Sequence, residues 1–457
     1  MSSVTEARAT RAVVNKVLWR IMPFIGLLYF ISFIDRIAIS FAGPHGMTAD
    51  LNLTATVFGL ASGIFFAGYI LLEVPSNIAL QRFGARVWLT RIIITWGIVQ
   101  ALMAFVPSAE WLIGARFLLG VAEAGFAPGV LVYLMYWIPK SRRVWAFSLF
   151  LLVPYVTNAI GGPLMTWLAL TSKDLIPGLA GWRTMILITG IAAIAAGVAA
   201  WVLLVDSPRK ARWLSTEERE TLLSAIAQEQ EVASDSNHRV MAGLKNPKVL
   251  LLSLAFFSLP FGFFGLTFFL PTIVAGFKAQ LGADFTPTMQ AGLTSLPWIC
   301  GIIGALVLST LADRTGRPGA VTLLSGSIGA LGALGAAFVD SPFTLIVMLS
   351  IAAFGLSAIA PTVFAIVPKV VAGTAAVAAT ALVNSLGSIG GFVGPYLTGF
   401  VTDLTGTQDV TYFLMAGFLV LGGFIALSID NRHRRIVGIR STGAPGLEPV
   451  LTNGNDK

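Results

Sequence analysis

Residues 21–43 read IMPFIGLLYFISFIDRIAISFAG, an apolar run that is interrupted by one acid and one base, Asp35 and Arg36. A helix needs about 20 apolar residues to cross the hydrocarbon core of a bilayer. Four basic residues precede the run, and no clear small-x-small cleavage site follows it. We therefore expect a retained first membrane span rather than a signal peptide.

Similar apolar runs recur along the 457 residues of the chain. The hydrocarbon core offers no partner to exposed backbone groups, so each run predicts a transmembrane helix. The predicted spans are 21–43, 56–80, 87–106, 111–136, 144–168, 183–205, 247–275, 290–312, 319–338, 343–368, 372–401 and 410–430.

The predicted fold is an all-α integral membrane protein with twelve transmembrane helices in two six-helix bundles. Residues 1–205 form the first bundle, residues 206–246 a charged cytoplasmic linker, and residues 247–457 the second bundle with a cytoplasmic tail. Within the linker, Ser215 followed by Thr216, Glu217 and Glu218 is typical of a helix N-cap.

The composition excludes a soluble globular enzyme, because only 11% of the residues are charged and 56% are hydrophobic, whereas soluble domains average about 25% charged residues. One cysteine, Cys300, cannot form a disulfide framework, and the three histidines lie outside the apolar runs. We expect no metal site, no cofactor and no His-based catalytic centre. The net charge of +8 reflects cytoplasmic loops in this interpretation, not a nucleic-acid partner.

The basic residues predict the orientation in the bilayer. With both termini placed in the cytoplasm, 25 of the 30 Lys and Arg fall on the cytoplasmic side, and only three fall outside. Cytoplasmic loops of membrane proteins carry this excess of positive charge. An odd number of spans would not give this pattern, so we expect both termini in the cytoplasm.

Ionisable residues within the predicted spans are concentrated in the first half of the chain. An ionised side chain at a span centre costs about 2.5–3.5 kcal/mol on insertion scales, so each needs a reason. The first six spans contain Asp35, Arg36, Glu73, Arg116 and Glu123, and the last six contain none. Arg116 and Glu123 are seven residues apart and share a helix face.

These charges suggest a binding site. A guanidinium presents a planar fork that suits a carboxylate or a phosphate, so Arg36 and Arg116 are candidates to hold an anion. A carboxyl group in a water-poor cavity can take up and release a proton near neutral pH, which makes Asp35 and Glu123 candidate proton carriers. The alternative is that Asp35 forms a neutral pair with Arg36 or Arg116 that only ties helices together. Glu73 favours a structural contact with the loop that follows its span.

The second half offers neutral polar groups instead. Asn384 and Ser388 are four residues apart on one helix face, and both are candidate substrate contacts, although ordinary interhelical hydrogen bonding explains Ser388 equally well. Pro395 adds a point where this span can break. In the fifth span, Tyr155 and Asn158 are further candidates.

Two cytoplasmic loops share one pattern. The loop after the second span contains Arg82, Gly84 and Arg86, and the loop after the eighth span repeats the pattern. The repeated positions are Asp313, Arg314, Gly316 and Arg317. We expect a structural loop motif in which Asp313 pairs across helix ends. Its recurrence in each half indicates an internal parallel repeat, as in transporters built from two such halves.

With these loops, the chain resembles the major facilitator superfamily, and Arg116-Phe-Leu-Leu-Gly120 is similar to its fourth-span signature. More narrowly, the chain resembles the anion:cation symporter family, bacterial permeases for tartrate, phthalate, sugar acids and aromatic acids. The stretches that carry this resemblance are LLYFISFIDRIAISFA, FFAGYILLEVPSN, RFLLGVAEAGFAPG, YWIPKSRR, FFLPTIV and NSLGSIGGFVGPYLTG.

The resemblance implies that spans 1, 4, 7 and 10 line a central cavity with alternating access. It implies proton coupling at Asp35 and Glu123 and anion binding at Arg36, with help from Arg116. Positions near the substrate in such permeases correspond here to Tyr29, Tyr69 and Asn384. The family's D-R-x-N pattern is modified, because Ala38 replaces the Asn, which leaves fine selectivity near Arg36 open.

We expect a monomeric transporter in the bacterial inner membrane that takes up a small organic carboxylate together with protons. Export by antiport within the same fold is the main alternative. A transporter-like sensor would need a partner-binding domain, which the short tails do not offer. A membrane-embedded enzyme acting on lipid would need a nucleophile and base or a metal cluster at membrane depth, and no His lies in a predicted span.

Overall fold

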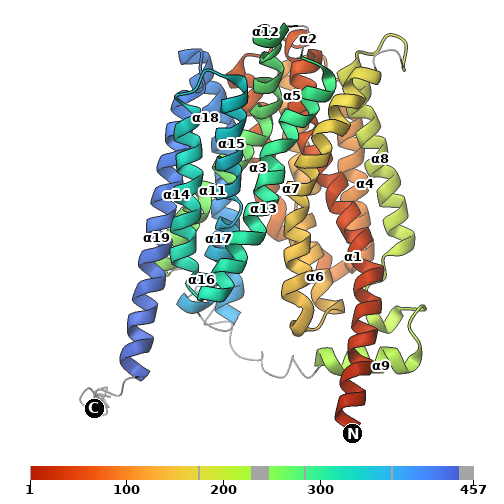
Figure 1. Cartoon of the computed structure of the whole chain (residues 1–457). Coiled ribbons are helices and arrows are strands. Elements are labelled where there is room, and N and C mark those ends of the chain that lie inside the picture. The colour runs from red at the N-terminus through yellow and green to blue at the C-terminus, as the bar shows by residue number, and fades with distance from the viewer. Residues whose placement is uncertain (1, 173–174, 228–245, 283–284, 372–373, 442–457) are drawn as a thin grey trace, which may run out of the picture.

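The structure is a computed structural model that describes residues 2–172, 175–227, 246–282, 285–371 and 374–441. Within these residues all regular structure is helical, and most helices run along one long axis (Figure 1). The start of α1 (Ser2–Ala42), the end of α19 (Asp409–Ser441) and α9 (Thr216–Ala227) lie at one end of the molecule, which we call the linker end (Figure 1). The opposite end, with the short helix α2 (Thr48–Asp50), is called the far end.

The first half of the chain begins with one long helix and its short extension at the far end. Its helical elements are α1 (Ser2–Ala42), η1 (Gly43–Met47), α2, α3 (Ala55–Phe83), α4 (Ala85–Met103), α5 (Ala109–Glu123), α6 (Phe126–Trp137), α7 (Lys140–Thr171) and α8 (Gly181–Leu203). They cover the six spans that the sequence predicts in this half.

The second half has a similar series of helices. They are α11 (Pro247–Gly276), α12 (Lys278–Leu281), α13 (Pro287–Thr315), α14 (Pro318–Ala336), α15 (Pro342–Leu356), α16 (Ile359–Val370), α17 (Thr374–Gly387), α18 (Ile389–Thr405) and α19 (Asp409–Ser441). Between the halves, the structure describes η2 (Pro208–Lys210) and α9 of the predicted linker.

The helix N-cap predicted in the linker is confirmed. The Ser215 Oγ accepts a hydrogen bond from the Glu218 backbone N–H (3.1 Å), and the Glu218 carboxylate accepts one from the Ser215 N–H (2.9 Å). This reciprocal pair satisfies two free donors at the start of α9. The same carboxylate forms an ion pair with Lys16 of α1 (2.7 Å), so the linker helix is docked on the first helix.

Eleven helical stretches of the described residues are long and apolar enough to cross a membrane. The predicted span 372–401 is not among them, because a turn at Ser388 divides it into α17 with 14 residues and α18 with 17. These two helices together supply a twelfth stretch. The break lies in the glycine-rich sequence around Ser388, and Pro395 lies inside α18 without interrupting it.

Two spans at equivalent places in the halves are broken near their middle. The fourth predicted span divides into α5 and α6 at Gly125, whose φ of 84° is in the left-handed region that favours glycine. The tenth divides into α15 and α16 at Ser357 and Ala358. The break after Glu123 frees backbone groups close to the predicted site.

The two halves pack directly against each other at the far end. A Cβ placed on Gly59 of α3 would lie 2.2 Å from the Pro395 carbonyl oxygen, and one placed on Gly399 of α18 would lie 2.0 Å from the Ala55 carbonyl oxygen. The Asp403 carboxylate of α18 accepts hydrogen bonds from the Ala55 and Thr56 N–H groups (3.0 and 2.7 Å) at the start of α3. One half thus caps a helix of the other.

At the linker end, the repeated loop motif is held in the same way in each half. The Arg86 N–H donates to Asp206 (3.0 Å), which also pairs with Lys210 (3.0 Å). The Gly319 N–H donates to Asp430 (3.2 Å), which pairs with Lys369 (2.6 Å).

Each capping aspartate follows the last apolar run of its half. The predicted pairing of Asp313 across helix ends does not occur, because Asp313 is exposed and forms no ion pair with a described residue. The other residues of the motif have separate positions. Arg82, Arg314, Gly316 and Arg317 lie at the helix ends, with Gly84 capping α3.

Candidate functional site

The predicted charges meet in one ion pair between α1 and α5. Arg36 of α1 forms a salt bridge with Glu123, the last residue of α5. Ser32, one turn before Arg36, donates a hydrogen bond to the same carboxylate (2.8 Å). Arg36 is 7% exposed and Glu123 is 1% exposed, so the pair is removed from water.

Aromatic rings surround the guanidinium of Arg36. Its Cζ lies 4.6 Å from the ring centre of Phe65, 5.2 Å from Phe33, 5.7 Å from Tyr69 and 5.8 Å from Phe66. Aromatic faces stabilise a cation at these distances. We call these four rings the aromatic cage, which holds Arg36 while leaving its Nε without a hydrogen-bond partner among the described residues.

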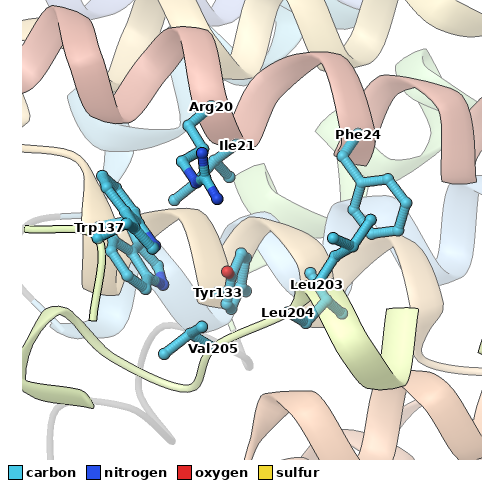
Figure 2. A pocket seen from close by; sticks show the side chains of 9 residues that line it. Arg20, Ile21, Phe24, Tyr133, Trp137, Leu203, Leu204 and Val205 are labelled. Carbon is cyan, nitrogen blue, oxygen red and sulfur yellow. The ribbon is translucent and has the colours of Figure 1, made fainter. Parts of the chain in front are cut away.

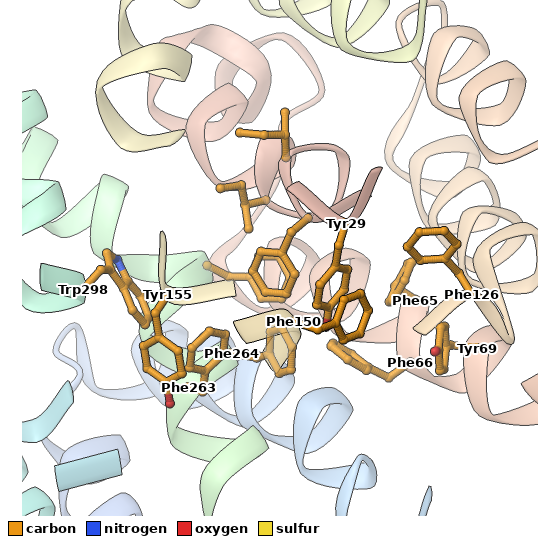
Figure 3. Packing of buried hydrophobic residues seen from close by; sticks show 14 of the residues in the cluster. Tyr29, Phe65, Phe66, Tyr69, Phe126, Phe150, Tyr155, Phe263, Phe264 and Trp298 are labelled. Atoms are coloured by element: carbon orange, nitrogen blue, oxygen red, sulfur yellow. The ribbon is translucent and has the colours of Figure 1, made fainter. Parts of the chain in front are cut away.

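Helix α11 closes the aromatic cage from the second half. The Phe264 ring centre lies 4.4 Å from that of Phe66 and 6.2 Å from that of Phe33. Figure 3 shows these rings as one layer that continues to Tyr155 and Trp298. Phe264 therefore covers the cage from the side of the second half.

Arg116 lies next to the cage but faces a different set of partners. Its guanidinium donates to the backbone carbonyls of Ala61 (3.1 Å) and Ser62 (3.3 Å) of α3, and it is fully buried. The ring of Phe65 contacts it as well, at 5.4 Å. Its Nη1 has no partner among the described residues, so one donor remains for a ligand.

Asp35 points to the other side of α1, toward α4. Trp96 donates its indole N–H to one carboxylate oxygen (3.0 Å), and the other oxygen has no partner among the described residues. The alternative that Asp35 neutralises Arg36 or Arg116 is not what the structure contains, because the ion pair of Arg36 is with Glu123.

The three predicted tyrosines and Asn158 lie in different surroundings. Tyr29 stacks on Phe150 (4.2 Å), and Tyr69 belongs to the aromatic cage. Tyr155 packs edge-on against Phe263 of the second half (5.1 Å). Asn158 donates to a carbonyl of its own helix (2.9 Å), and this bond does not reach the ion pair.

Glu73 corrects one expectation from the sequence. It does not contact the loop that follows its span, because α3 continues as a helix to Phe83. Instead, Ser385 of α17 donates to its carboxylate (3.2 Å). Sequence reasoning did not find this contact between the halves. Ser388, in the turn after α17, donates to the Asn384 carbonyl four residues earlier (2.7 Å). This bond is local and not the interhelical one that the alternative expected, so the role of Ser388 stays a prediction.

A bundle of membrane-length helices with a buried ion pair at its centre is typical of a membrane transport protein. The family model described as Major Facilitator Superfamily matches residues 25–334 and again residues 278–450. The chain belongs to this superfamily, and it is a multi-pass membrane transporter, not an enzyme. The superfamily resemblance predicted from the sequence is confirmed.

Curated relatives and solved structures agree with this assignment. A "Putative tartrate transporter" of Agrobacterium vitis is 37% identical over 95% of this chain and 94% of its own. A "Quinolone resistance transporter" of Acinetobacter baumannii is 34% identical over 94% and 98%. The crystal structure of a bacterial homologue of the human lysosomal transporter Spinster, inward-facing and unoccupied, matches 93% of this chain and 98% of that one, with a TM-score of 0.66 at 18% identity. That likeness concerns the fold alone.

Proposed function

We propose that the protein takes up a small organic carboxylate together with protons across the bacterial inner membrane, by alternating access. The observation that carries the proposal is the buried Arg36–Glu123 ion pair inside the aromatic cage. The relative named as a tartrate transporter supports an organic anion as the substrate class.

Proton binding and anion binding are coupled in this proposal because Glu123 and the substrate carboxylate compete for the Arg36 guanidinium. While Glu123 is ionised, it occupies Arg36 as its counter-ion. When Glu123 binds a proton, it loses its charge, and Arg36 is left as an uncompensated buried cation, which is unfavourable. A substrate carboxylate restores neutrality by binding the guanidinium fork. Proton binding and anion binding therefore favour each other at this site.

Asp35 is proposed as a second proton carrier, because one of its carboxylate oxygens has no partner. Arg116 is proposed to assist in anion binding through its free Nη1. The remaining candidate contacts for hydroxyl or ring groups of the substrate are Tyr29, Tyr69, Tyr155, Asn158, Asn384 and Ser388. When the two halves move relative to each other, Phe264 would move away from the aromatic cage, and the substrate could then reach Arg36.

The direction of transport is part of the proposal. The excess of basic residues at the linker end supports a cytoplasmic position for both termini and for that end, with a single chain as the transport unit. Export of an anion by proton antiport is the second candidate, and the relative named as a quinolone resistance transporter favours it.

Uptake into proteoliposomes with radiolabelled tartrate as the probe tests the proposal. We expect accumulation driven by an inward proton gradient and dependent on Arg36. Glu123→Gln should lose this accumulation but keep tartrate exchange across the membrane without a gradient. Glu110→Gln, at an exposed acid on the same helix, is the matched control and should behave like the wild type.

The outcomes separate the candidates. Full gradient-driven accumulation by Glu123→Gln would remove this residue from coupling. Accumulation driven by an outward proton gradient, in vesicles of the same orientation, would favour antiport.

A further inference from the structure

A cavity lies at the linker end, away from the buried ion pair. It has a volume of about 350 Å³ and lies between α1, α6, α8 and the chain after α8 (Figure 2). Arg20, Phe24, Trp137, Leu203 and Trp213 are among its lining residues. No contact of these side chains involves Arg36 or Glu123, so the cavity is separate from the proposed transport site.

One side of this cavity offers positive charge and a free donor. Arg20 lies over the Trp213 ring at 5.2 Å and forms no ion pair with any described residue. Trp137 is 1% exposed, and its indole Nε1 has no hydrogen-bond partner among the described residues. Trp137 and Trp213 stack at 5.7 Å with their planes 10° apart, which fixes the donor in place.

The two polar groups need the same kind of partner. A buried N–H without an acceptor is unfavourable, and an unpaired guanidinium favours an anion with several oxygens. Figure 2 shows Arg20 and Trp137 on the same side of the cavity. An anionic group with at least two oxygens, such as a phosphate diester, satisfies both.

The opposite side of the cavity is apolar and includes a residue that is exposed on the outside of the helix bundle. Figure 2 shows Phe24 and Leu203 there, away from Arg20 and Trp137. Leu203 is 56% exposed at the end of the membrane helix α8. A ligand that fits the whole cavity is therefore amphipathic, with an anionic head and an apolar tail.

We propose that this cavity binds an anionic phospholipid of the leaflet at the linker end. The phosphate lies between Arg20 and the Trp137 N–H, and an acyl chain follows Phe24 and Leu203 into the bilayer. Basic pockets between membrane helices on the cytoplasmic side suit such head groups. The proposal rests on the orientation proposed above, and it does not depend on which solute is transported.

Binding would also join the first half to the linker. The stack of Trp137 on Trp213 connects α6 with the segment that leads to α9, and the proposed lipid contacts this stack together with α1. The bound lipid therefore stabilises the arrangement in which the linker lies against the first half.

The test uses the full chain in nanodiscs of phosphatidylcholine with an increasing fraction of phosphatidylglycerol. Native mass spectrometry counts the retained phosphatidylglycerol, and thermal unfolding follows its effect on Tm. We expect selective retention and a rise in Tm for the wild type. Arg20→Gln should weaken retention about fivefold, the effect of about 1 kcal/mol for one basic group near a membrane surface. Trp137→Phe should weaken it by a similar factor, because a net hydrogen bond contributes about 1 kcal/mol.

Arg209→Gln is the matched control, because Arg209 is an exposed basic residue at the linker end that does not line the cavity. It should retain phosphatidylglycerol like the wild type. Equal losses in Arg20→Gln and Arg209→Gln would overturn the proposal in favour of unspecific charge attraction, and unchanged retention in Arg20→Gln and Trp137→Phe would overturn it outright.

Glycerol 3-phosphate, added to nanodiscs of pure phosphatidylcholine, distinguishes the source of the anion. A rise in Tm with this soluble phosphate, together with no response to phosphatidylglycerol, would overturn the lipid assignment in favour of a free anion. Tartrate uptake in proteoliposomes of pure phosphatidylcholine reports separately on the proposed function.

Discussion

At the scale of single residues, the centre of the molecule contains one arginine whose counter-ion belongs to the protein. Arg36 is held by Glu123 and by the aromatic cage, so in the proposed mechanism a substrate carboxylate has to replace an internal carboxylate at the guanidinium. This displacement makes the geometry of the guanidinium important as well as its charge.

Arg36→Lys should therefore reduce uptake strongly. Lysine keeps the positive charge, but it loses the planar fork and the stacking on the cage. We expect at least about a tenfold loss of kcat/KM for tartrate, equal to about 1.4 kcal/mol of lost binding. Initial uptake rates in proteoliposomes measure it, and Arg209→Lys is the control at an exposed site. Wild-type kinetics in Arg36→Lys would contradict a role for the fork.

Trp96→Phe tests the support of Asp35. The change keeps most of the ring but removes the indole N–H that donates to the Asp35 carboxylate. Losing the donor to a buried acceptor destabilises a protein by about 1–3 kcal/mol, so Tm should fall. Trp111→Phe, at a residue that is 67% exposed, should leave Tm close to that of the wild type. Equal Tm values for both variants would contradict this account.

Which residues are charged at membrane depth could be predicted from the sequence, because the free energy of burying charge makes Asp35, Arg36, Arg116 and Glu123 conspicuous in apolar runs. Their partners could not. Whether Asp35 faces Arg116 or Trp96 depends on the rotation of α1 against its neighbours, and the period of an apolar run does not fix that rotation. The role of these residues in coupling stays a prediction.

At the scale of elements, the broken helix α5–α6 places Glu123 two residues before Gly125. The backbone at Gly125 has φ of 84°, and a Cβ there would lie 2.5 Å from the Ser76 Oγ. Gly125→Ala should destabilise the protein by about 1–2 kcal/mol from the left-handed backbone alone.

Gly114→Ala is the control for Gly125→Ala, because a Cβ there meets nothing within 4 Å and the residue lies inside α5. This change should leave stability unchanged or raise it by up to about 1 kcal/mol. Thermal unfolding in detergent measures both variants. A lower Tm for Gly114→Ala than for Gly125→Ala would contradict the assignment.

The contact of Asp403 with the start of α3 is expected to depend on pH. Burial acts to raise the pKa of Asp403, but the hydrogen bonds from Thr56 and its neighbours outweigh this and hold the pKa below its usual value. A lowered pKa means that the contact contributes stability above about pH 3.9, the value in an unfolded chain. This contribution is lost as the pH falls through the lower folded pKa.

Asp403→Asn should remove most of this pH dependence and loosen the far end at neutral pH. Spin labels on α3 and α18 near the far end, read by double electron–electron resonance, should report longer distances than in the wild type. Asp409→Asn, at an acid of the neighbouring helix α19, is the control. Identical distance distributions in Asp403→Asn and the wild type would contradict the role of this cap.

The broken helices were only partly predictable. Pro395 predicted a possible break in the eleventh span. The break occurs instead at Ser388, where glycines on both sides make a non-helical backbone less costly. A proline in a membrane helix is tolerated when neighbouring helices restore the freed backbone bonds. The sequence shows where a helix can break, and packing against other helices decides where it does.

At the scale of the whole molecule, the halves meet most closely between α3 and α18 at the far end. Gly399→Ala would place a Cβ 2.0 Å from the Ala55 carbonyl oxygen, so the halves should separate there. In a Cys300→Ser background, a cysteine introduced at Thr56 should react faster with a membrane-impermeant maleimide in this variant.

Gly417→Ala is the control for that experiment, because a Cβ at Gly417 of α19 meets nothing within 4 Å. It should leave the labelling rate unchanged. Unchanged labelling in Gly399→Ala would contradict the view that this contact keeps the far end closed.

The helix content and the superfamily could be predicted from the sequence, because bilayer thickness fixes the length of apolar runs. How the two halves pack against each other in this structure could not be predicted. It depends on contacts such as Gly59 with Pro395 and Glu73 with Ser385, which join positions more than 300 residues apart, and one sequence alone carries no signal for such pairs.

The two capping aspartates have a mechanical consequence. Asp206 fastens the start of α4 to the end of the α8 segment, and Asp430 fastens the start of α14 to α19. Each half is thereby clamped internally at the linker end by its own carboxylate. In the proposed alternating-access cycle we therefore expect each half to move as one stiff block, with the deformation confined to the contacts between the halves.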